Sequence, residues 1–376
     1  MDKYLHIISF NIPWPANYGG VIDVFHKIRS LHLCGIKIIL HCFEYERPQA
    51  SELEKYCHQI YYYKRDTGIV ANLTLLPYNV YSRKRKELID NLLKDNHPIL
   101  FEGLHSCYYF SDERLKRRIR IFRSCNVEHD YYLSLAKAES NPVYKLFYRI
   151  ESIRFRFFEK KVRNATHILA VSTTDVDHFR TTYPEAKVSF MPCFHANDEL
   201  QILPGESDFV LYHGKLSVLE NEKAALYLIR NLFSRLTTSC IIAGMDPSAT
   251  LKKEAARYKN IKLIANPSEE EMNMLTTSAQ VHTLITFQDT GLKLKLLNSL
   301  FKGRHVLVNS MMLAGSGLES LCYVADDKNK LIEKCNYLLS KKVDSQVIEK
   351  RNTLLNPTFS NLHQAKCLIN IIYLSE

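Results

Sequence analysis

One segment in the second half of the chain contains all the parts of a βαβ unit. An apolar run, Val281 to Ile285, predicts a strand, and it precedes Thr290-Gly291-Leu292-Lys293-Leu294-Lys295-Leu296-Leu297-Asn298. Gly291 is then the turn from loop into helix, and the second strand follows as Gly303-Arg304-His305-Val306-Leu307-Val308. A helix N-terminus offers unpaired backbone N–H groups and a partial positive charge, which attract anions. With Lys293 and Lys295 beside it, the segment predicts a diphosphate site; the alternative is a solvated basic first turn.

Length and composition limit the class of protein. A chain of 376 residues is long for one compact core and favours two domains. Its 50 Lys+Arg against 40 Asp+Glu give a formal charge of +10, which favours anionic partners without choosing among nucleotides, nucleic acid and anionic lipid. The 10 cysteines are scattered and no leader-like apolar region opens the chain, which predicts reduced thiols in the cytoplasm. Apolar runs of membrane-spanning length are absent from the sequence, so no span is expected.

Short apolar runs alternate with amphipathic stretches along both halves of the chain, which predicts two parallel sheets with covered faces. In the first half the predicted strands are Leu5 to Phe10, Ile36 to Phe43, Ile60 to Tyr63, Ile99 to Glu102, Ile121 to Phe122 and Ile168 to Val171. In the second half they are Phe209 to Tyr212, Cys240 to Ala243, Ile261 to Ile264, Val281 to Ile285, Val306 to Val308 and Leu321 to Val324. Between the halves, Cys193 to Asp208 contains Pro204-Gly205 and few aliphatic residues, as a linker does.

Ligands of open α/β sheets bind beyond the carboxyl ends of the strands, so the loops that follow the strands hold the candidate residues. Gly19-Gly20 end the loop after the first strand, just before a helix expected from Val21, and let the backbone approach a sugar or phosphate; the alternative is a turn that merely needs glycine. Gly214-Lys215 follow the first strand of the second half and also suit a phosphate. Neither loop has the dinucleotide or P-loop pattern.

The densest polar cluster follows the fifth strand of the first half. It contains Asn126, Glu128, His129 and Tyr131, and His105 follows the preceding strand. A histidine and a carboxylate at a strand end suit acid–base work or the binding of hydroxyl groups. The alternative is a structural polar cluster.

These motifs, in this order, resemble the GT-B glycosyltransferases and, within them, the retaining family 4 of bacterial polysaccharide type. The similarity covers nearly the whole chain. It rests on Gly19-Gly20, on Asn126 to His129, on Val171-Ser172 with Asp175 and Phe179, on Gly214-Lys215-Leu216-Ser217 where the family has Gly-Arg-Leu-Ser, and on Thr290 to Asn298 with the Gly303-Arg304-His305-Val306 turn. The resemblance implies two Rossmann-like domains facing across a cleft, and a transfer with retention that needs neither metal ion nor cofactor.

The chain departs from the family in one respect. Family members usually carry two glutamates in an E-x7-E arrangement around the glycine loop, and the aligned positions here are Thr290 and Asn298. In the resembled proteins the second glutamate grips the nucleotide ribose and the first lies near the donor sugar. Asn298 still has a donor and an acceptor for ribose hydroxyls, whereas Thr290 has no charge. The departure motivates one alternative, a sugar-nucleotide-binding partner protein without turnover. A second alternative is a GT-B-fold sugar-nucleotide epimerase, which would consume free nucleotide sugar without an acceptor.

Three further patterns have competing interpretations. Asp175-Val176-Asp177 has the Asp-x-Asp form of a metal site, but Ser172 before it predicts a capped helix start instead. Val143 to Arg163 has apolar residues at helical spacing among many basic ones, which fits a helix packed on the sheet or a membrane-surface patch. Arg83-Lys84-Arg85-Lys86 fits an exposed helix start that could also contact lipid phosphates. Nucleic-acid binding is not expected, because no recognised module accompanies either basic run.

We therefore predict a metal-independent glycosyltransferase of hexosyltransferase type in surface polysaccharide or glycoconjugate biosynthesis. It would move a sugar from a UDP- or GDP-linked donor to a saccharide or lipid-linked acceptor, in the cytoplasm or on the inner face of the membrane. The predicted domains are an acceptor domain over 1–195, a nucleotide-sugar domain over 205–355 and a helix over 356–376 that crosses back. Donor contacts are predicted at Gly19, Gly20, Gly214, Lys215, Thr290, Gly291, Leu292, Lys293, Lys295 and Asn298, catalytic residues at His129, Glu128 and Asn126, and acceptor contacts at His105 and Tyr131.

Overall fold

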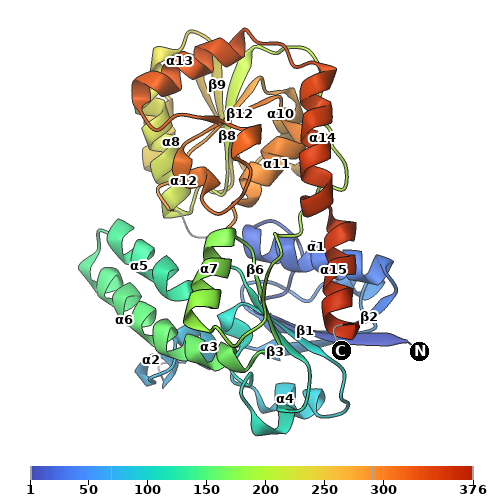
Figure 1. The fold of residues 1–376 in the computed structure, drawn as a ribbon. Helices are drawn as coiled ribbons and strands as arrows, with labels where there is room; N and C mark the ends of the chain where they lie inside the picture. The colour runs from blue at the N-terminus through green and yellow to red at the C-terminus, as the bar shows by residue number, and fades with distance from the viewer. Residues whose placement is uncertain (1, 69, 289–290, 375–376) are drawn as a thin grey trace. The chain divides into compact units, whose positions relative to one another are not determined.

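The structure is a computed structural model that describes residues 2–68, 70–288 and 291–374. The described residues form two compact units (Figure 1). Unit 1 comprises Met1–Phe194, Thr290–Leu292 and Thr358–Glu376, and unit 2 comprises His195–Asp289 and Lys293–Pro357. Each unit is an open parallel sheet with helices packed on it, which confirms the predicted α/β class with two Rossmann-like units.

Unit 1 contains seven parallel strands in the order β3-β2-β1-β4-β5-β6-β7. Neighbouring residues of a strand point to opposite faces, so Ile7 and Ile8 belong to two separate hydrophobic layers. The strands are β1 (Lys3–Ser9), β2 (Ile36–Glu44), β3 (Gln59–Lys64), β4 (Ile99–Glu102), β5 (Arg120–Ser124), β6 (His167–Ala170) and β7 (Val188–Phe190). The helices before residue 194 are α1 (Gly19–Leu33), α2 (Val70–Leu73), α3 (Tyr78–Tyr81), α4 (Lys86–Leu92), α5 (Glu128–Ala138), α6 (Pro142–Glu159) and α7 (Thr173–Thr182).

Unit 2 repeats this strand order with six parallel strands, β10-β9-β8-β11-β12-β13. The strands are β8 (Phe209–His213), β9 (Ser239–Gly244), β10 (Ile261–Ala265), β11 (Val281–Leu284), β12 (His305–Val308) and β13 (Tyr323–Val324). The helices are α8 (Leu219–Asn231), α9 (Ala249–Ala255), α10 (Glu269–Ser278), α11 (Leu294–Lys302), α12 (Ser310–Leu313), α13 (Lys328–Leu339) and α14 (Ser345–Phe359), the last two residues of α14 belonging to unit 1. Figure 1 shows α8 on one face of this sheet and α10 and α11 on the other.

The last helix, α15 (Asn361–Tyr373), belongs to unit 1 although it follows all of unit 2 in the sequence. It packs beside α1, and its buried residues Ala365, Leu368 and Ile372 join the hydrophobic layer that contains Ile7. The Tyr373 hydroxyl donates a hydrogen bond of 2.7 Å to the carbonyl oxygen of Tyr4. The C-terminal helix therefore completes the core that the N-terminal strand begins.

A buried charge network lies at the centre of unit 1. Lys27 Nζ on α1 donates to Glu102 Oε1 at 2.7 Å and to Asp23 Oδ2 at 3.2 Å, with all three side chains at most 1% exposed. Arg123 on β5 lies 3.3 Å from Asp23 Oδ2 and donates to the carbonyl oxygen of Pro192 at 2.9 Å. Burial opposes the charge of Asp23, but Arg123 and Lys27 hold its pKa below the ordinary value. The network joins α1, β4 and β5 to the segment that leaves unit 1.

Two helices begin at residues that differ from those predicted. Gly291 was expected to start a helix, but it has a φ of +64°, in the left-handed region, so α11 begins only at Leu294 with Lys293 as its N-cap. In α1 the start moves the other way: Gly19 and Gly20 are its first two residues rather than the end of the preceding loop.

The helix α6 buries a different face from the one predicted for Val143 to Arg163. Its buried residues are Glu151, Phe155, Phe158 and Glu159, because α6 packs against α5 and Glu151 accepts hydrogen bonds from Tyr78 N and Arg154. Most of the predicted apolar face is exposed, namely Val143, Leu146, Ile150, Ile153 and Phe157. The prediction that this face packs on the sheet is therefore wrong.

The basic run of residues 83–86 also differs from its prediction. Arg83 is buried and its Nε donates to the carbonyl oxygen of Phe10 at 2.8 Å, so the predicted lipid contact is wrong for this residue. Ser172, by contrast, caps α7 by accepting from Asp175 N at 3.1 Å, as expected for a helix start.

The charge network predicts a large stability effect for Lys27→Met. Removing Lys27 leaves Glu102 and Asp23 buried without their shared cation, which costs about 3–5 kcal/mol. Urea unfolding of the full chain should show this loss in the transition that reports unit 1. The matched control is Lys37→Met, because the Lys37–Asp2 ion pair is exposed and should contribute no measurable stability. Equal midpoints for wild type and Lys27→Met would contradict the prediction.

Candidate functional site

The strand order of unit 2 reverses between β8 and β11, and the predicted phosphate-binding residues follow these two strands. In doubly wound sheets this switch point, at the carboxyl ends of the strands, is where ligands bind. Gly214 and Lys215 come directly after β8, while Lys293 and Lys295 come at the start of α11 after β11. The fold therefore brings together two of the segments that were selected from the sequence.

Lys295 is the centre of this group. Its Nζ donates to Asn221 Oδ1 at 2.6 Å, and it lies 3.4 Å from Tyr212 Oη and 5.0 Å from the centroid of the Tyr212 ring. Desolvation lowers the pKa of Lys295 to about 8, which nearby Glu220 opposes and Lys293 reinforces. Among the residues that the structure describes, Lys295 is hydrogen-bonded only to neutral groups. A partly buried ammonium group held by neutral partners retains capacity to bind an anion.

Two glycines let the loop after β8 lie close to Lys295. A Cβ atom built on Gly214 would lie 3.2 Å from Lys295 Nζ. A Cβ atom on Gly244, the last residue of β9, would lie 1.8 Å from the carbonyl oxygen of Gly214. Gly244 was not predicted as a site residue, although a glycine directly after a buried strand is the available sequence signal. The Gly214 turn depends on this absence of a side chain.

The remaining predicted donor contacts differ from Lys295 in their burial and in their hydrogen-bond partners. Asn298 on α11 accepts a hydrogen bond of 3.2 Å from Asn197 Nδ2 within unit 2, and Lys215 is exposed. Leu292 is half-buried, and Thr290 lies outside the described residues. In unit 1, a Cβ atom on Gly20 would lie 2.6 Å from Cζ of Phe10, so this glycine has a packing role whether or not it contacts a ligand.

The polar cluster of unit 1 surrounds the first turn of α5. Glu128, its first residue, is buried, and its Oε2 lies 3.8 Å from Nε2 of His105, in the 3₁₀ helix Leu104–Ser106 after β4. Burial, together with the charges of Glu159 and Asp175, raises the pKa of Glu128 to about 8. Desolvation and the charges of Arg83 and Arg65 lower the pKa of His105 to about 3.

Asn126 and Tyr131 flank this turn. Asn126, in the loop before α5, is half-buried, and its carbonyl oxygen accepts from Ser124 Oγ at 2.9 Å. The half-buried Tyr131 packs edge-on against Tyr132, with ring centroids 5.9 Å apart. Each thus lies within one turn of Glu128, as the sequence spacing requires.

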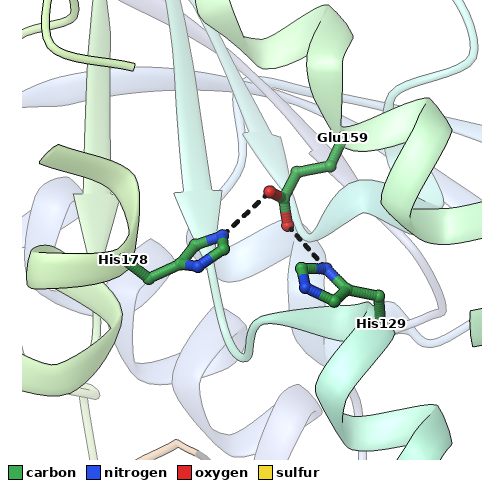
Figure 2. Close-up of side chains that lie close together, drawn as sticks. All are labelled: His129, Glu159 and His178. Carbon is green, nitrogen blue, oxygen red and sulfur yellow. Dashed lines mark hydrogen bonds and ion pairs between the residues drawn. The ribbon is translucent and has the colours of Figure 1, made fainter. Parts of the chain in front are cut away.

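His129, the next residue after Glu128, contacts Glu159. Its Nδ1 lies 3.5 Å from Glu159 Oε2, and on the other side His178 Nε2 lies 2.9 Å from Glu159 Oε1 (Figure 2). Burial raises the pKa of Glu159, but the neighbouring imidazoles of His129 and His178 outweigh it and leave the pKa lowered. Glu159 and His178 were missed from the sequence. They lie on α6 and α7, and only the fold brings them to His129.

The architecture of the two units is that of the GT-B glycosyltransferases. Similar solved structures include HepE from Anabaena in complex with UDP and glucose, with 10% identity, 97% of this chain and 98% of that chain covered, and a TM-score of 0.65. WaaG, a glycosyltransferase involved in lipopolysaccharide biosynthesis, has 12% identity, 98% and 99% coverage and a TM-score of 0.66. A glycosyltransferase from Rickettsia africae has 14% identity, full coverage of both chains at 100%, and a TM-score of 0.64. At these identities the similarity establishes the fold.

Sequence comparison gives one particular relative. An uncharacterised 44.6 kDa protein in the cps region of Klebsiella pneumoniae is 25% identical over 336 residues, which are 83% of this chain and 84% of the relative. No protein-family profile matches the chain. Membership of glycosyltransferase family 4 therefore stays a prediction.

Gly244→Ala should disrupt the candidate phosphate site. The new Cβ atom cannot coexist with the Gly214 carbonyl oxygen at 1.8 Å, so the Gly214 turn must move away from Lys295 or unit 2 must lose stability. We expect a lower melting temperature and loss of nucleotide binding, measured by thermal unfolding and calorimetry. Gly68→Ala is the control, because its new Cβ atom would meet only the flexible Asp66 carboxylate, at 3.2 Å. Wild-type behaviour of Gly244→Ala would contradict the described turn.

Proposed function

We propose that the protein is a glycosyltransferase that takes a sugar from a nucleoside-diphosphate donor bound in unit 2. The observation that supports this proposal is the position of Lys295, with its partners Asn221 and Tyr212, at the β8–β11 switch point of a GT-B fold. HepE, of the same fold, has been crystallised with UDP and glucose and with UDP-glucose, which supports a nucleotide-sugar donor. The Klebsiella relative is encoded in a cps region, which supports a role in polysaccharide or glycoconjugate biosynthesis.

The donor would be held mainly by charge. Lys293, Lys295 and Lys215 would neutralise the diphosphate, and the charge that develops on the leaving group is what such a site must stabilise most. The first turn of α11 adds backbone N–H groups. Asn298 would contact the ribose. By the resemblance to family 4, the transfer would proceed with retention and without a metal ion on the phosphates.

The acceptor would be held in unit 1. Glu128, His105 and Asn126 lie together at the carboxyl ends of β4 and β5 and offer hydrogen-bonding groups to a sugar hydroxyl. Tyr131 offers a ring for a sugar face. His129, directed to Glu159, would position the first turn of α5 and thereby Glu128.

The two alternatives give different results with the same reagents. A partner protein would bind nucleotide sugars and turn over none of them, which the threonine and asparagine in place of the two family glutamates would favour. An epimerase would consume a nucleotide sugar without an acceptor. Release of nucleoside diphosphate that requires an added saccharide or lipid-linked acceptor identifies the transferase.

The donor site predicts that Lys295→Ala weakens UDP or GDP binding. Losing one charge-assisted contact costs about 1.5–3 kcal/mol, or roughly 10- to 150-fold in affinity, measured by calorimetry. Lys215→Ala should also lower the affinity for UDP or GDP. Because the pKa of Lys295 is about 8, its charge is present at pH 7 and lost at pH 9, so wild-type affinity should fall over this interval. Lys295→Arg should remove that fall.

The control for this prediction lies on the same helix. Lys302→Ala, at the last residue of α11, should bind nucleoside diphosphates as the wild type does. Binding should also survive EDTA, because no metal is proposed on the phosphates. If neither Lys295→Ala nor Lys215→Ala lowers the affinity, the donor site lies elsewhere in the chain.

We also propose that α6 rests on an anionic membrane surface. None of the helices in residues 2–68, 70–288 and 291–374 has both the length and the apolar character needed to cross a bilayer. The exposed apolar face of α6, however, lies among the basic residues Lys145, Arg149, Arg156 and Lys160. Apolar side chains flanked by basic ones match the interface of an anionic bilayer.

Liposome sedimentation tests the membrane proposal. Wild type should sediment with vesicles of phosphatidylglycerol and phosphatidylcholine and less with phosphatidylcholine alone, and high salt should release it. Ile153→Glu with Phe157→Glu should abolish sedimentation, because both side chains are exposed and the change costs no core packing. Leu362→Glu, exposed on α15, is the matched control. The proposal fails if the double variant sediments as the wild type does.

A further inference from the structure

Three side chains from three helices of unit 1 converge at His129, Glu159 and His178, which we call the His-Glu-His cluster (Figure 2). Their candidate ligand atoms all lie within 4.8 Å of one another. Glu159 is 3% exposed, while His129 and His178 are 16% and 23% exposed. One side of the cluster is thus closed by protein and the other is open to solvent.

Two atoms of the cluster lack the hydrogen bonds that burial requires. His129 Nδ1 and Glu159 Oε2 are both buried, neither has a hydrogen-bond partner, and the two atoms lie 3.5 Å apart as an ion pair. Buried polar atoms are rarely left in this state, because each costs free energy. Two ligands of one tetrahedral zinc ion, each about 2.0–2.1 Å from it, lie about 3.4 Å apart. The separation therefore fits two ligands of one metal better than it fits a hydrogen bond.

The surroundings also fit a metal site. Ligating histidines commonly direct their second ring nitrogen toward a carboxylate, and His129 Nε2 lies 3.7 Å from Asp130 Oδ1. Ligating carboxylates are commonly held by a hydrogen bond, and Tyr183 Oη donates to Glu159 Oε1 at 3.3 Å. Two imidazoles and one carboxylate form an established three-residue ligand set for zinc, with the fourth coordination position left for water.

A second group of potential ligands in unit 1 shows what a structural charge cluster looks like. Asp23, Glu102 and Cys125 also lie within reach of one another, but the ammonium group of Lys27 and the guanidinium group of Arg123 already neutralise the carboxylates. In the His-Glu-His cluster, among the described residues, no lysine or arginine forms an ion pair with Glu159. The ion-pair partners of Glu159 are His129 and His178.

We propose that the His-Glu-His cluster binds one divalent transition-metal ion, with zinc as its best match. The ion would tie together α5, the end of α6 and α7. It would fix the first turn of α5, where Glu128 lies next to His129. The cluster belongs to unit 1 and the donor lysines belong to unit 2, and the test of the metal site does not depend on the transferase proposal.

Metal content and affinity test the inference on the full chain. The protein is freed of metal with EDTA, the chelator is removed, and zinc is titrated with a competing chromophoric chelator. We expect one tight equivalent per chain and a rise in melting temperature. Cobalt(II) in its place should give the visible absorption of a four-coordinate ion. Glu159→Gln and His178→Ala should each weaken zinc binding by about 100-fold or more, since loss of outer contacts alone costs about 10- to 100-fold. Tyr183→Phe should weaken it by about 10-fold.

Two controls separate this cluster from adventitious binding. His363 and Cys367 lie one turn apart on α15, with Nε2 and Sγ 3.4 Å apart, and could bind zinc on their own. His363→Ala should leave the tight equivalent intact, as should His167→Asn, a half-buried histidine of unit 1 bonded to Ser189. Circular dichroism of metal-free Glu159→Gln checks that the variant is folded. The inference is overturned if the wild type binds no zinc ion tightly, or if Glu159→Gln and His178→Ala both bind zinc with wild-type affinity. It is also overturned if His363→Ala loses the tightly bound zinc ion.

Discussion

The interior of unit 1 depends on one ammonium group. Lys27 lies between Glu102 and Asp23, and Arg123 completes the charge balance from β5. Asp23 also accepts a hydrogen bond of 2.7 Å from Phe194 N, and Arg123 binds the carbonyl oxygen of Pro192. The same four charges therefore fix the first helix, two central strands and the path by which the chain leaves the unit. A buried network of this kind is sensitive to the loss of any one member, because each loss leaves a charge without its partner.

Buried charges elsewhere in the protein can be sorted by the same criterion. Where a buried cation has carboxylate partners, as Lys27 has, its role is structural. Lys295 is also desolvated, but its hydrogen-bond partners are the neutral Asn221 and Tyr212. This difference in partners is the reason why we propose Lys295 as a ligand of the donor diphosphate. Glu159 is the opposite case, a buried carboxylate whose neighbours are the imidazoles of His129 and His178, which is why we propose a metal ion there.

Much of the fold was predictable from the sequence because hydrophobic runs determine parallel strands directly. β4 was predicted with its observed bounds, whereas β7, which has only three residues, was missed. The first residues of helices were harder to predict. Gly291 has a positive φ that the loop imposes, so α11 begins after it, and the hydrophobic pattern of the helix does not indicate this. The buried face of α6 could not be deduced from hydrophobic periodicity. The helix packs on α5, and the residues that it buries there include the two glutamates Glu151 and Glu159. Residues such as Lys295 could be selected from local motifs, but the partners of His129 are brought close only by tertiary structure.

The position of α15 affects the order in which the protein can be made. Domains tend to fold as units while a chain emerges from the ribosome, the N-terminal one first. Here the hydrophobic layer around Ile7 lacks Ala365, Leu368 and Ile372 until α15 has been synthesised. The first half must therefore wait, with an apolar face uncovered, while the whole of unit 2 is synthesised. A chain that stops after α14 would keep that face open, and such products should be targets for chaperones and proteases.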